Sequence, residues 1–116
     1  MQRYYTDGSS TIVVKSAYIV TDEKGTLLEF GQTMAPCFTS NEEEYRGVIA
    51  ALNLCKEGDE VLTDSQLVVN QINGLFKVKA KHLLAYRNEA KELADKKQVL
   101  IRWISRDENL AGKHFE

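Results

Sequence analysis

The order of strand-like and helix-like segments constrains the fold of this chain more than any other feature of its sequence. Residues 3–6, 11–21 and 26–33 are rich in β-branched and aromatic side chains, and the turn-forming residues 22–25 separate the last two runs. Three such runs joined by short connections predict an antiparallel meander. This meander occupies the first third of the chain.

The rest of the chain alternates between helical and strand-like patterns. The expected elements are, in order, a helix over 41–56 capped within Thr39-Ser40-Asn41, a strand over 60–63, a helix capped by Asp64 and Ser65 and ended by Asn73-Gly74, a helix over 78–97, a strand over 98–104, and the start of a last helix at Asn109. Ser40 and Glu43 have capping-box spacing at the start of the first helix. Because the later strands need crossover connections, the sequence predicts an α/β fold with a mixed sheet.

Length and composition indicate one globular unit. The chain has 116 residues, of which 43% are hydrophobic, so we expect a single domain over 1–116, with its last helix a candidate for truncation. Cys37 and Cys55 lack metal-ligand spacing, and we interpret both as small buried residues of a cytoplasmic protein. The sequence contains no apolar run near the ~20 residues of a membrane span.

Charge is unevenly distributed along the chain. The formal net charge is −2, but residues 77–97 carry seven Lys or Arg against three acids, a local net charge of +4 that leaves −6 for the rest. Basic side chains on one segment, with the acids gathered elsewhere, are typical of a protein that holds a polyanion on one surface and cations at another. The alternative is an ordinary solvated helix face.

Three carboxylates lie where the predicted fold brings elements together. Asp7 and Asp64 each follow a strand, so both emerge at one edge of the sheet if those strands are parallel neighbours. Glu44 lies in the first turn of the first helix, beside its apolar stripe. Periodicity does not separate Glu44 from Glu42, which flanks the other side of the stripe, whereas Glu43 is expected to face outward. Oxygen ligands without Cys or His indicate Mg²⁺ or Mn²⁺.

Each of these acids also has a purely structural interpretation. Asp7-Gly8 is a common turn signal, acids at a helix start complement the helix dipole, and Asp64-Ser65 can be a helix cap. Among the other side chains that could carry chemistry, we interpret His82 and His114 as surface residues, and Trp103 and Tyr86 as core residues.

With these acids in view, the chain resembles the type 1 ribonuclease H family over nearly its whole length. The resemblance rests on Tyr5-Thr6-Asp7-Gly8-Ser9, on Thr39 to Tyr45 with Gly47 to Leu52 after it, on Leu62 to Val68, and on Arg106-Asp107-Glu108-Asn109. It implies a five-stranded mixed sheet of order 3-2-1-4-5, with the first three strands antiparallel and helices on both faces. Its register selects Glu44 over Glu42.

The family's activity gives these residues implied roles. It implies a metal-dependent endoribonuclease that cleaves the RNA strand of RNA·DNA hybrids, with Asp7, Glu44 and Asp64 holding two Mg²⁺ ions for which Mn²⁺ can substitute. The implied partner is the hybrid, with no membrane, and we expect a monomer. Expected nucleic-acid contacts are Ser9, Asn41, Ser65, Lys77, Lys79 and Lys81.

Two departures from the family pattern are visible. The family places Asp four residues beyond Asn109, where this chain has Lys113, so Glu116 becomes the candidate fourth metal ligand, with Asp107 or Glu108 as a weaker substitute. The basic protrusion of some members is absent, and the segment 77–97 could partly replace it. The alternative functions are a non-catalytic nucleic-acid-binding module of the same fold and a related nuclease with another substrate.

Overall fold

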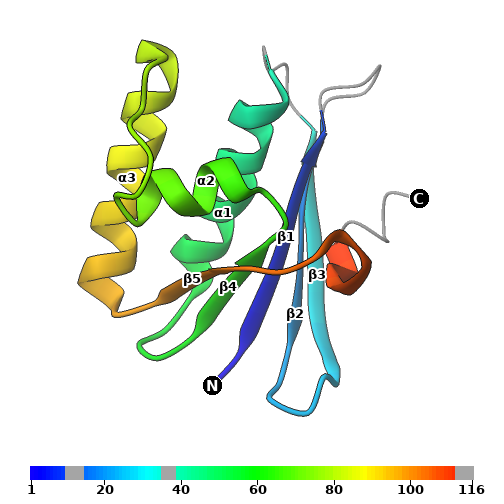
Figure 1. The fold of residues 1–116 in the computed structure, drawn as a ribbon. Helices are drawn as coiled ribbons and strands as arrows, with labels where there is room; N and C mark the ends of the chain where they lie inside the picture. Colours follow the sequence, from blue (N-terminus) through cyan, green and yellow to red (C-terminus); the bar gives the residue numbers. More distant parts are fainter. Residues whose placement is uncertain (10–14, 35–38, 112–116) are drawn as a thin grey trace.

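A computed structural model describes residues 1–9, 15–34 and 39–111, and within them five strands form one mixed sheet. The strands are β1 (Arg3–Ser9), β2 (Lys15–Thr21), β3 (Leu27–Met34), β4 (Glu60–Thr63) and β5 (Leu100–Trp103). Their order is β3-β2-β1-β4-β5 (Figure 1). Strands β1, β2 and β3 pair antiparallel, whereas β4 lies parallel to β1 and β5 parallel to β4. The predicted meander and crossovers are confirmed.

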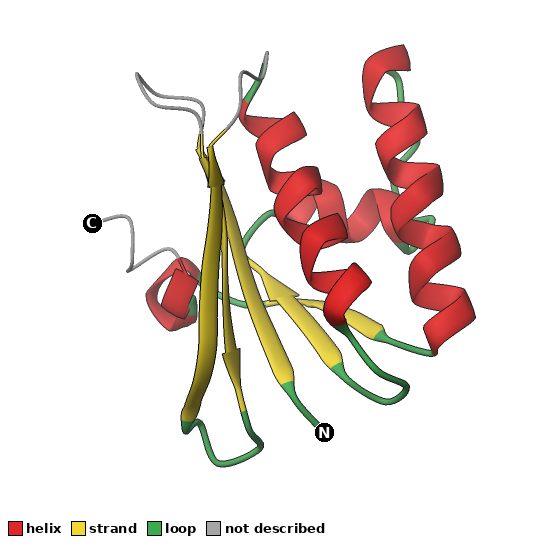
Figure 2. Cartoon of the chain, turned by 180° about the vertical axis from the view of Figure 1, so that it is seen from behind, coloured by secondary structure: helices red, strands yellow, loops and turns green. Residues whose placement is uncertain are grey.

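The α-helices of the described residues gather on one face of this sheet. They are α1 (Ser40–Leu54), α2 (Gln66–Ile72) and α3 (Lys81–Lys97). A short 3₁₀ helix, η1 (Arg106–Glu108), lies against the opposite face (Figures 1 and 2). The connection from β3 to β4 runs through α1, and the start of this helix lies against the end of β1 at Gly8.

The starts of α1 and α3 differ from the sequence prediction. Helix α1 is capped by Thr39, whose side-chain oxygen accepts a hydrogen bond from the Glu42 N–H at 3.1 Å. The predicted box of Ser40 and Glu43 is therefore wrong by one residue, because Thr39 keeps the extended backbone of a cap while Ser40 is already helical. Helix α3 begins at Lys81 rather than at Val78, which packs against the core from the preceding loop.

The core lies between the sheet and the helices. Tyr45, Val48 and Leu52 of α1 are fully buried. Cys55 is buried as predicted, and Cys37 lies outside the described residues. On α3, Leu83 and Ala90 are buried, whereas Leu84 is 44% exposed.

Trp103 also departs from the prediction. Its side chain is 46% exposed, not buried in the core. It is the last residue of an edge strand, so only one neighbouring strand flanks it.

No helix among the described residues has both the length and the apolar character needed to cross a membrane.

Candidate metal centre

The pairing of β1 with β4 brings Asp7 and Asp64 together. In this parallel pair Thr6 lies opposite Thr63, and each threonine directly precedes one of the aspartates. Both aspartates therefore lie side by side just past the last residues that pair β1 with β4. Asp64 follows β4 as predicted, whereas Asp7 lies within β1, because this strand continues to Ser9 along β2. This juxtaposition follows from strand register alone, which is why the sequence could predict it.

Glu44 reaches the same edge because α1 approaches β1 at a glycine. A Cβ atom at Gly8 would lie 2.3 Å from the carbonyl carbon of Glu43 and 2.4 Å from the backbone nitrogen of Glu44. Only a residue without a side chain permits this approach. The Gly8 N–H then donates a hydrogen bond to Oε1 of Glu44 at 3.1 Å, which fixes the carboxylate beside Asp7.

The three carboxylates form one compact cluster. One oxygen from each of Asp7, Glu44 and Asp64 lies within 4.8 Å of the others, and all three side chains are half-buried. Burial, followed by the charge of Asp7, raises the pKa of Glu44 to about 9. Burial also raises the pKa of Asp7, with a contribution from the Asp64 charge, while hydrogen bonds with Glu44 and Gly8 and the Arg106 charge oppose the rise.

This donor set fits a divalent cation. The acidic groups crowd one another, and burial disfavours their charged forms, so a cation among the oxygens would offset both costs. Carboxylate oxygens without sulfur or imidazole suit hard ions such as Mg²⁺ and Mn²⁺. The geometry therefore agrees with the ligand chemistry expected from the sequence.

The neighbouring glutamates of α1 have other surroundings. Glu42 is buried towards α3, where Nε2 of His82 lies 3.7 Å from Oε1 and the Tyr86 hydroxyl donates to Oε2 at 3.4 Å. Glu43 is only 1% exposed, with Nη1 of Arg46 3.5 Å from its Oε1. The expectation that Glu43 faces outward is therefore wrong, because the close approach at Gly8 covers the first turn of α1. Of the three, Glu44 alone belongs to the carboxylate cluster.

Buried polar side chains hold the backbone around the cluster. The Thr63 hydroxyl donates to Oε2 of Glu44 at 3.4 Å and accepts a hydrogen bond from the Ser65 N–H at 3.2 Å. Asn109, fully buried, donates from Nδ2 to the Thr6 carbonyl at 2.9 Å and so ties the segment after β5 to β1. Asn109 belongs to the motif Arg106-Asp107-Glu108-Asn109, but sequence patterns alone do not predict that its side chain ties this segment to β1.

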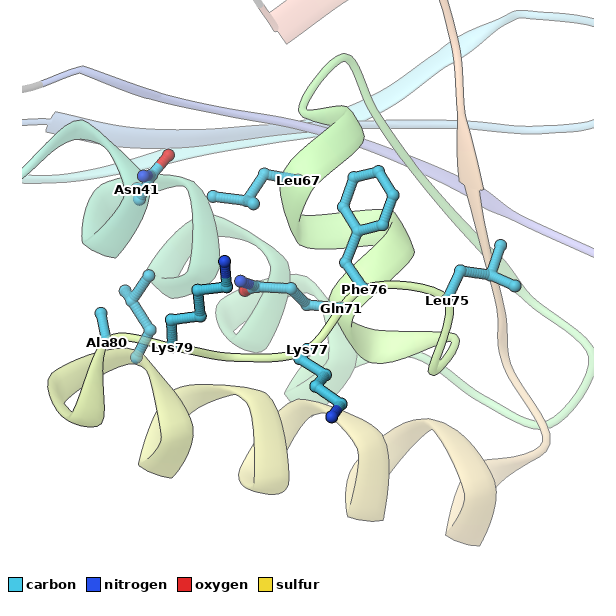
Figure 3. Close-up of a pocket in the computed structure, with 9 residues that line it drawn as sticks. Asn41, Leu67, Gln71, Leu75, Phe76, Lys77, Lys79 and Ala80 are labelled. Atoms are coloured by element: carbon cyan, nitrogen blue, oxygen red, sulfur yellow. The ribbon is translucent and has the colours of Figure 1, made fainter.

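Three of the expected nucleic-acid contacts line one hollow, to which the start of α1 also contributes. Asn41, Lys77 and Lys79 border a cavity of about 590 Å³ between the first turn of α1, helix α2 and the loop before α3 (Figure 3). Its other lining residues are mostly apolar and include the half-exposed Phe76. The Lys79 side chain extends towards Gln71, whereas that of Lys77 points the other way, towards α3 (Figure 3).

The remaining candidates are not brought to this hollow. Lys81 is exposed at the first position of α3, and the Ser65 hydroxyl caps α2 by accepting a hydrogen bond from the Val68 N–H at 3.2 Å. Asp107 is exposed in η1. The Ser9 side chain, and the whole of Lys113, His114 and Glu116, lie outside what the structure describes. His82 is exposed, as predicted.

Sequence comparison relates nearly the whole chain to a known family. A family model described as "Reverse transcriptase-like" matches residues 6–114. The bifunctional protein Rv2228c of Mycobacterium tuberculosis is 35% identical over 98 residues, which cover 80% of this chain and 27% of that protein. An uncharacterized protein of Mycobacterium bovis matches to the same extent. The chain thus spans about a quarter of the length of these curated relatives.

Solved structures with the same arrangement are RNase H1 proteins. The enzyme of the halophilic archaeon Halobacterium salinarum NRC-1 superposes with a TM-score of 0.87 at 25% identity, covering 97% of this chain and 92% of that one. LC11-RNase H1 in complex with an RNA/DNA hybrid gives a TM-score of 0.86 at 25% identity, with 98% and 92% covered. The N-terminal RNase H domain of Rv2228c, fused to maltose binding protein, superposes with a TM-score of 0.83 at 28% identity. The superposition covers 97% of this chain and 94% of that one.

Proposed function

The chain belongs to the reverse transcriptase-like family and has the ribonuclease H type 1 fold, and from this premise we propose that it is a divalent-metal-dependent endoribonuclease acting on the RNA strand of RNA·DNA hybrids. The observation that carries the proposal is the convergence of Asp7, Glu44 and Asp64 within 4.8 Å at the carboxyl edge of the sheet. A neighbour with the same fold was solved with an RNA/DNA hybrid, which supports this class of substrate.

The carboxylate cluster has a defined task in this proposal. Two Mg²⁺ ions, or Mn²⁺ in their place, would supply Lewis acidity at the scissile phosphate and a nucleophilic water at neutral pH. Asp7, Glu44 and Asp64 would hold these ions. Glu116 and Asp107 stay predictions for the fourth ligand. The Gly8 N–H and the Thr63 hydroxyl orient Glu44 for this task.

The hollow beside the cluster gives the hybrid a binding surface. Asn41 offers amide hydrogen bonds three residues before Glu44, and Lys77 and Lys79 offer positive charge for phosphates. Such contacts recognise the shape of the hybrid rather than its sequence, together with the 2′-hydroxyls that distinguish RNA from DNA. We propose Lys81, Ser9 and Ser65 as further contacts, and we propose that the domain acts as a monomer in the cytoplasm.

A cleavage assay tests the proposal. The protein is incubated with labelled RNA·DNA hybrid, double-stranded RNA or double-stranded DNA, in Mg²⁺, in Mn²⁺ and in EDTA. We expect cutting of the RNA strand of the hybrid alone, only with metal, and its loss in Asp64→Asn. The matched control is Asp95→Asn, which changes an exposed acid on α3 and should leave the rate unchanged.

The other outcomes separate the alternative functions. Metal-independent binding of the hybrid without cutting, unchanged in Asp64→Asn, would replace the enzyme with a non-catalytic binding module. Preferential cutting of double-stranded RNA or DNA would indicate a related nuclease with another substrate.

A further inference from the structure

Trp103 has an unusual position for the only tryptophan of the sequence. It lies on β5 opposite the fully buried Thr63, which itself pairs with Thr6 of β1, so these three residues form one row across β1, β4 and β5. Asp7 and Asp64 of the carboxylate cluster directly follow Thr6 and Thr63 of this row. Yet the Trp103 side chain is 46% exposed, so packing in the core does not account for its placement there.

The indole instead makes a directed contact with a residue of the cluster. Its Nε1–H donates a hydrogen bond to the backbone carbonyl of Asp64 at 3.1 Å. Asp64 lies between the end of β4 and Ser65, the cap of α2, and is part of neither element. An indole N–H can only donate a hydrogen bond, and here its acceptor is the Asp64 carbonyl oxygen.

A second contact, from the residue directly after β5, holds the residue before Asp64. The Ile104 N–H donates to the Thr63 carbonyl at 3.0 Å, next to the indole contact. Two successive carbonyls of this short segment are therefore held by two successive residues at the end of β5. The direction of the Asp64 side chain depends on the backbone that these contacts fix.

We propose that Trp103 is a positioning residue for the metal site, which holds the Asp64 backbone so that its carboxylate faces Asp7 and Glu44. This inference rests on the proposed function, because it concerns the metal that the cluster would bind. Groups outside the ligand shell typically change metal affinity by about 10- to 100-fold when removed. Since Trp103 acts through a main-chain atom, we expect that removing its N–H lowers the metal affinity by about tenfold, the lower end of this range.

The test removes the donor and keeps the shape. Because the chain has one tryptophan, growth of a tryptophan auxotroph on β-(3-benzothienyl)alanine replaces this indole N–H alone with sulfur. Binding of Mn²⁺ is measured without substrate, from the electron paramagnetic resonance of the free ion. We expect the dissociation constant to rise about tenfold relative to the natural protein. Leu100→Ala, at the exposed opposite end of β5, is the matched control and should bind Mn²⁺ normally.

Steady-state kinetics on the hybrid give a second readout. Positioning of a metal ligand predicts that the analogue needs about tenfold more Mg²⁺ for half-maximal cleavage, with the KM for the hybrid unchanged at saturating Mg²⁺. A raised KM with unchanged Mn²⁺ affinity would instead make Trp103 a substrate contact and overturn the proposal.

Emission from the same indole reports on the site in the natural protein. Mg²⁺ binding to the cluster should shift the Trp103 fluorescence with the affinity found for cleavage, and Asp64→Asn should abolish that shift. Equal Mn²⁺ affinity of the natural and analogue proteins would overturn the positioning role and leave the metal site intact. Absence of Mn²⁺ binding in the natural protein would overturn the proposed metal site, and the role of Trp103 with it.

Discussion

At the scale of single residues, Gly8 decides how close α1 comes to the carboxylate cluster. An added Cβ would lie 2.3 Å from backbone of α1, which cannot give way as a flexible side chain can. We predict that Gly8→Ala lowers the free energy of unfolding by about 3 kcal/mol, the cost of overpacking a filled site. It should also reduce cleavage at saturating metal, because Glu44 shifts with its helix. Urea unfolding and the hybrid assay measure the two effects.

A second glycine provides the control for this substitution. Gly25 lies in the turn between β2 and β3 with a φ of +87° and open space around its Cβ position. Gly25→Ala should cost about 1 kcal/mol through backbone strain alone and leave cleavage unchanged. Equal stability losses at both glycines, with cleavage intact in Gly8→Ala, would contradict the role of the close approach.

Repulsion within the cluster gives a prediction of opposite sign for Asp7. Because the pKa of Glu44 is about 9, Glu44 is protonated without metal at neutral pH, and the repulsion that Asp7 feels comes from the charge of Asp64. Two unit charges ~5 Å apart repel by about 3 kcal/mol at an effective dielectric of 20. Asp7→Asn removes this repulsion and keeps a group that can hydrogen-bond Glu44. We predict that it raises the free energy of unfolding by about 1 kcal/mol in EDTA, while abolishing cleavage in Mg²⁺. A variant less stable than the natural protein in EDTA would show that the carboxylates do not repel one another.

At the scale of elements, a lysine of α3 closes the end of α1. The Lys97 Nζ donates to the carbonyls of Leu52, Asn53 and Cys55 at 2.8, 3.0 and 3.2 Å. These carbonyls lie at the negative end of the helix dipole, which favours a cation there. We predict that Lys97→Met, which keeps the aliphatic stem, lowers the free energy of unfolding by about 1–2 kcal/mol.

The neighbouring lysine separates this contact from simple charge loss. Lys96 is exposed on the same last turn of α3, so Lys96→Met removes an equal charge. Its free energy of unfolding, measured by the same urea titration, should stay within about 0.5 kcal/mol of the natural protein. If both variants lost the same stability, general electrostatics rather than capping would explain the Lys97 effect.

Most of the elements could be predicted from the sequence because they depend on local patterns. Alternating β-branched residues and helical apolar spacing identify the strands and helices, and strand pairing places Asp7 beside Asp64. Errors arise where neighbours distant in sequence decide the outcome. The burial of Glu43 depends on contact with Gly8, and the exposure of Trp103 depends on its place at the end of an edge strand.

In the candidate site, too, local sequence patterns predict some features, whereas others depend on residues distant in sequence. Periodicity left Glu42 and Glu44 equivalent, because both flank one apolar stripe, and the family register was needed to choose Glu44. The structure separates them by their partners, with Glu42 facing His82 and Glu44 facing Asp7. The hollow at Asn41 could not be predicted from local sequence patterns, because α1, α2, α3 and a loop all contribute to its lining.

At the scale of the whole molecule, opposite charges occupy different regions around the proposed site. The acids converge at the sheet edge, while Lys77 and Lys79 lie on the neighbouring hollow. A hybrid bound across both would place backbone phosphates near the lysines and one phosphate at the carboxylates with their cations. Binding should therefore release counterions in proportion to the number of lysine contacts, despite the net charge of −2.

Replacing both lysines by glutamine tests this arrangement through salt dependence. Each lysine that neutralises a phosphate contributes ~0.9 to the slope of log binding constant against log salt concentration. We predict that Lys77→Gln with Lys79→Gln flattens the slope by about 2 when hybrid binding to an Asp64→Asn background is measured from 50 to 200 mM salt. Lys56→Gln with Lys96→Gln removes the same charge from exposed positions away from the hollow and should leave the slope unchanged. Equal flattening in both pairs would mean that the protein attracts the hybrid through its overall charge, and that the hollow is not the binding surface.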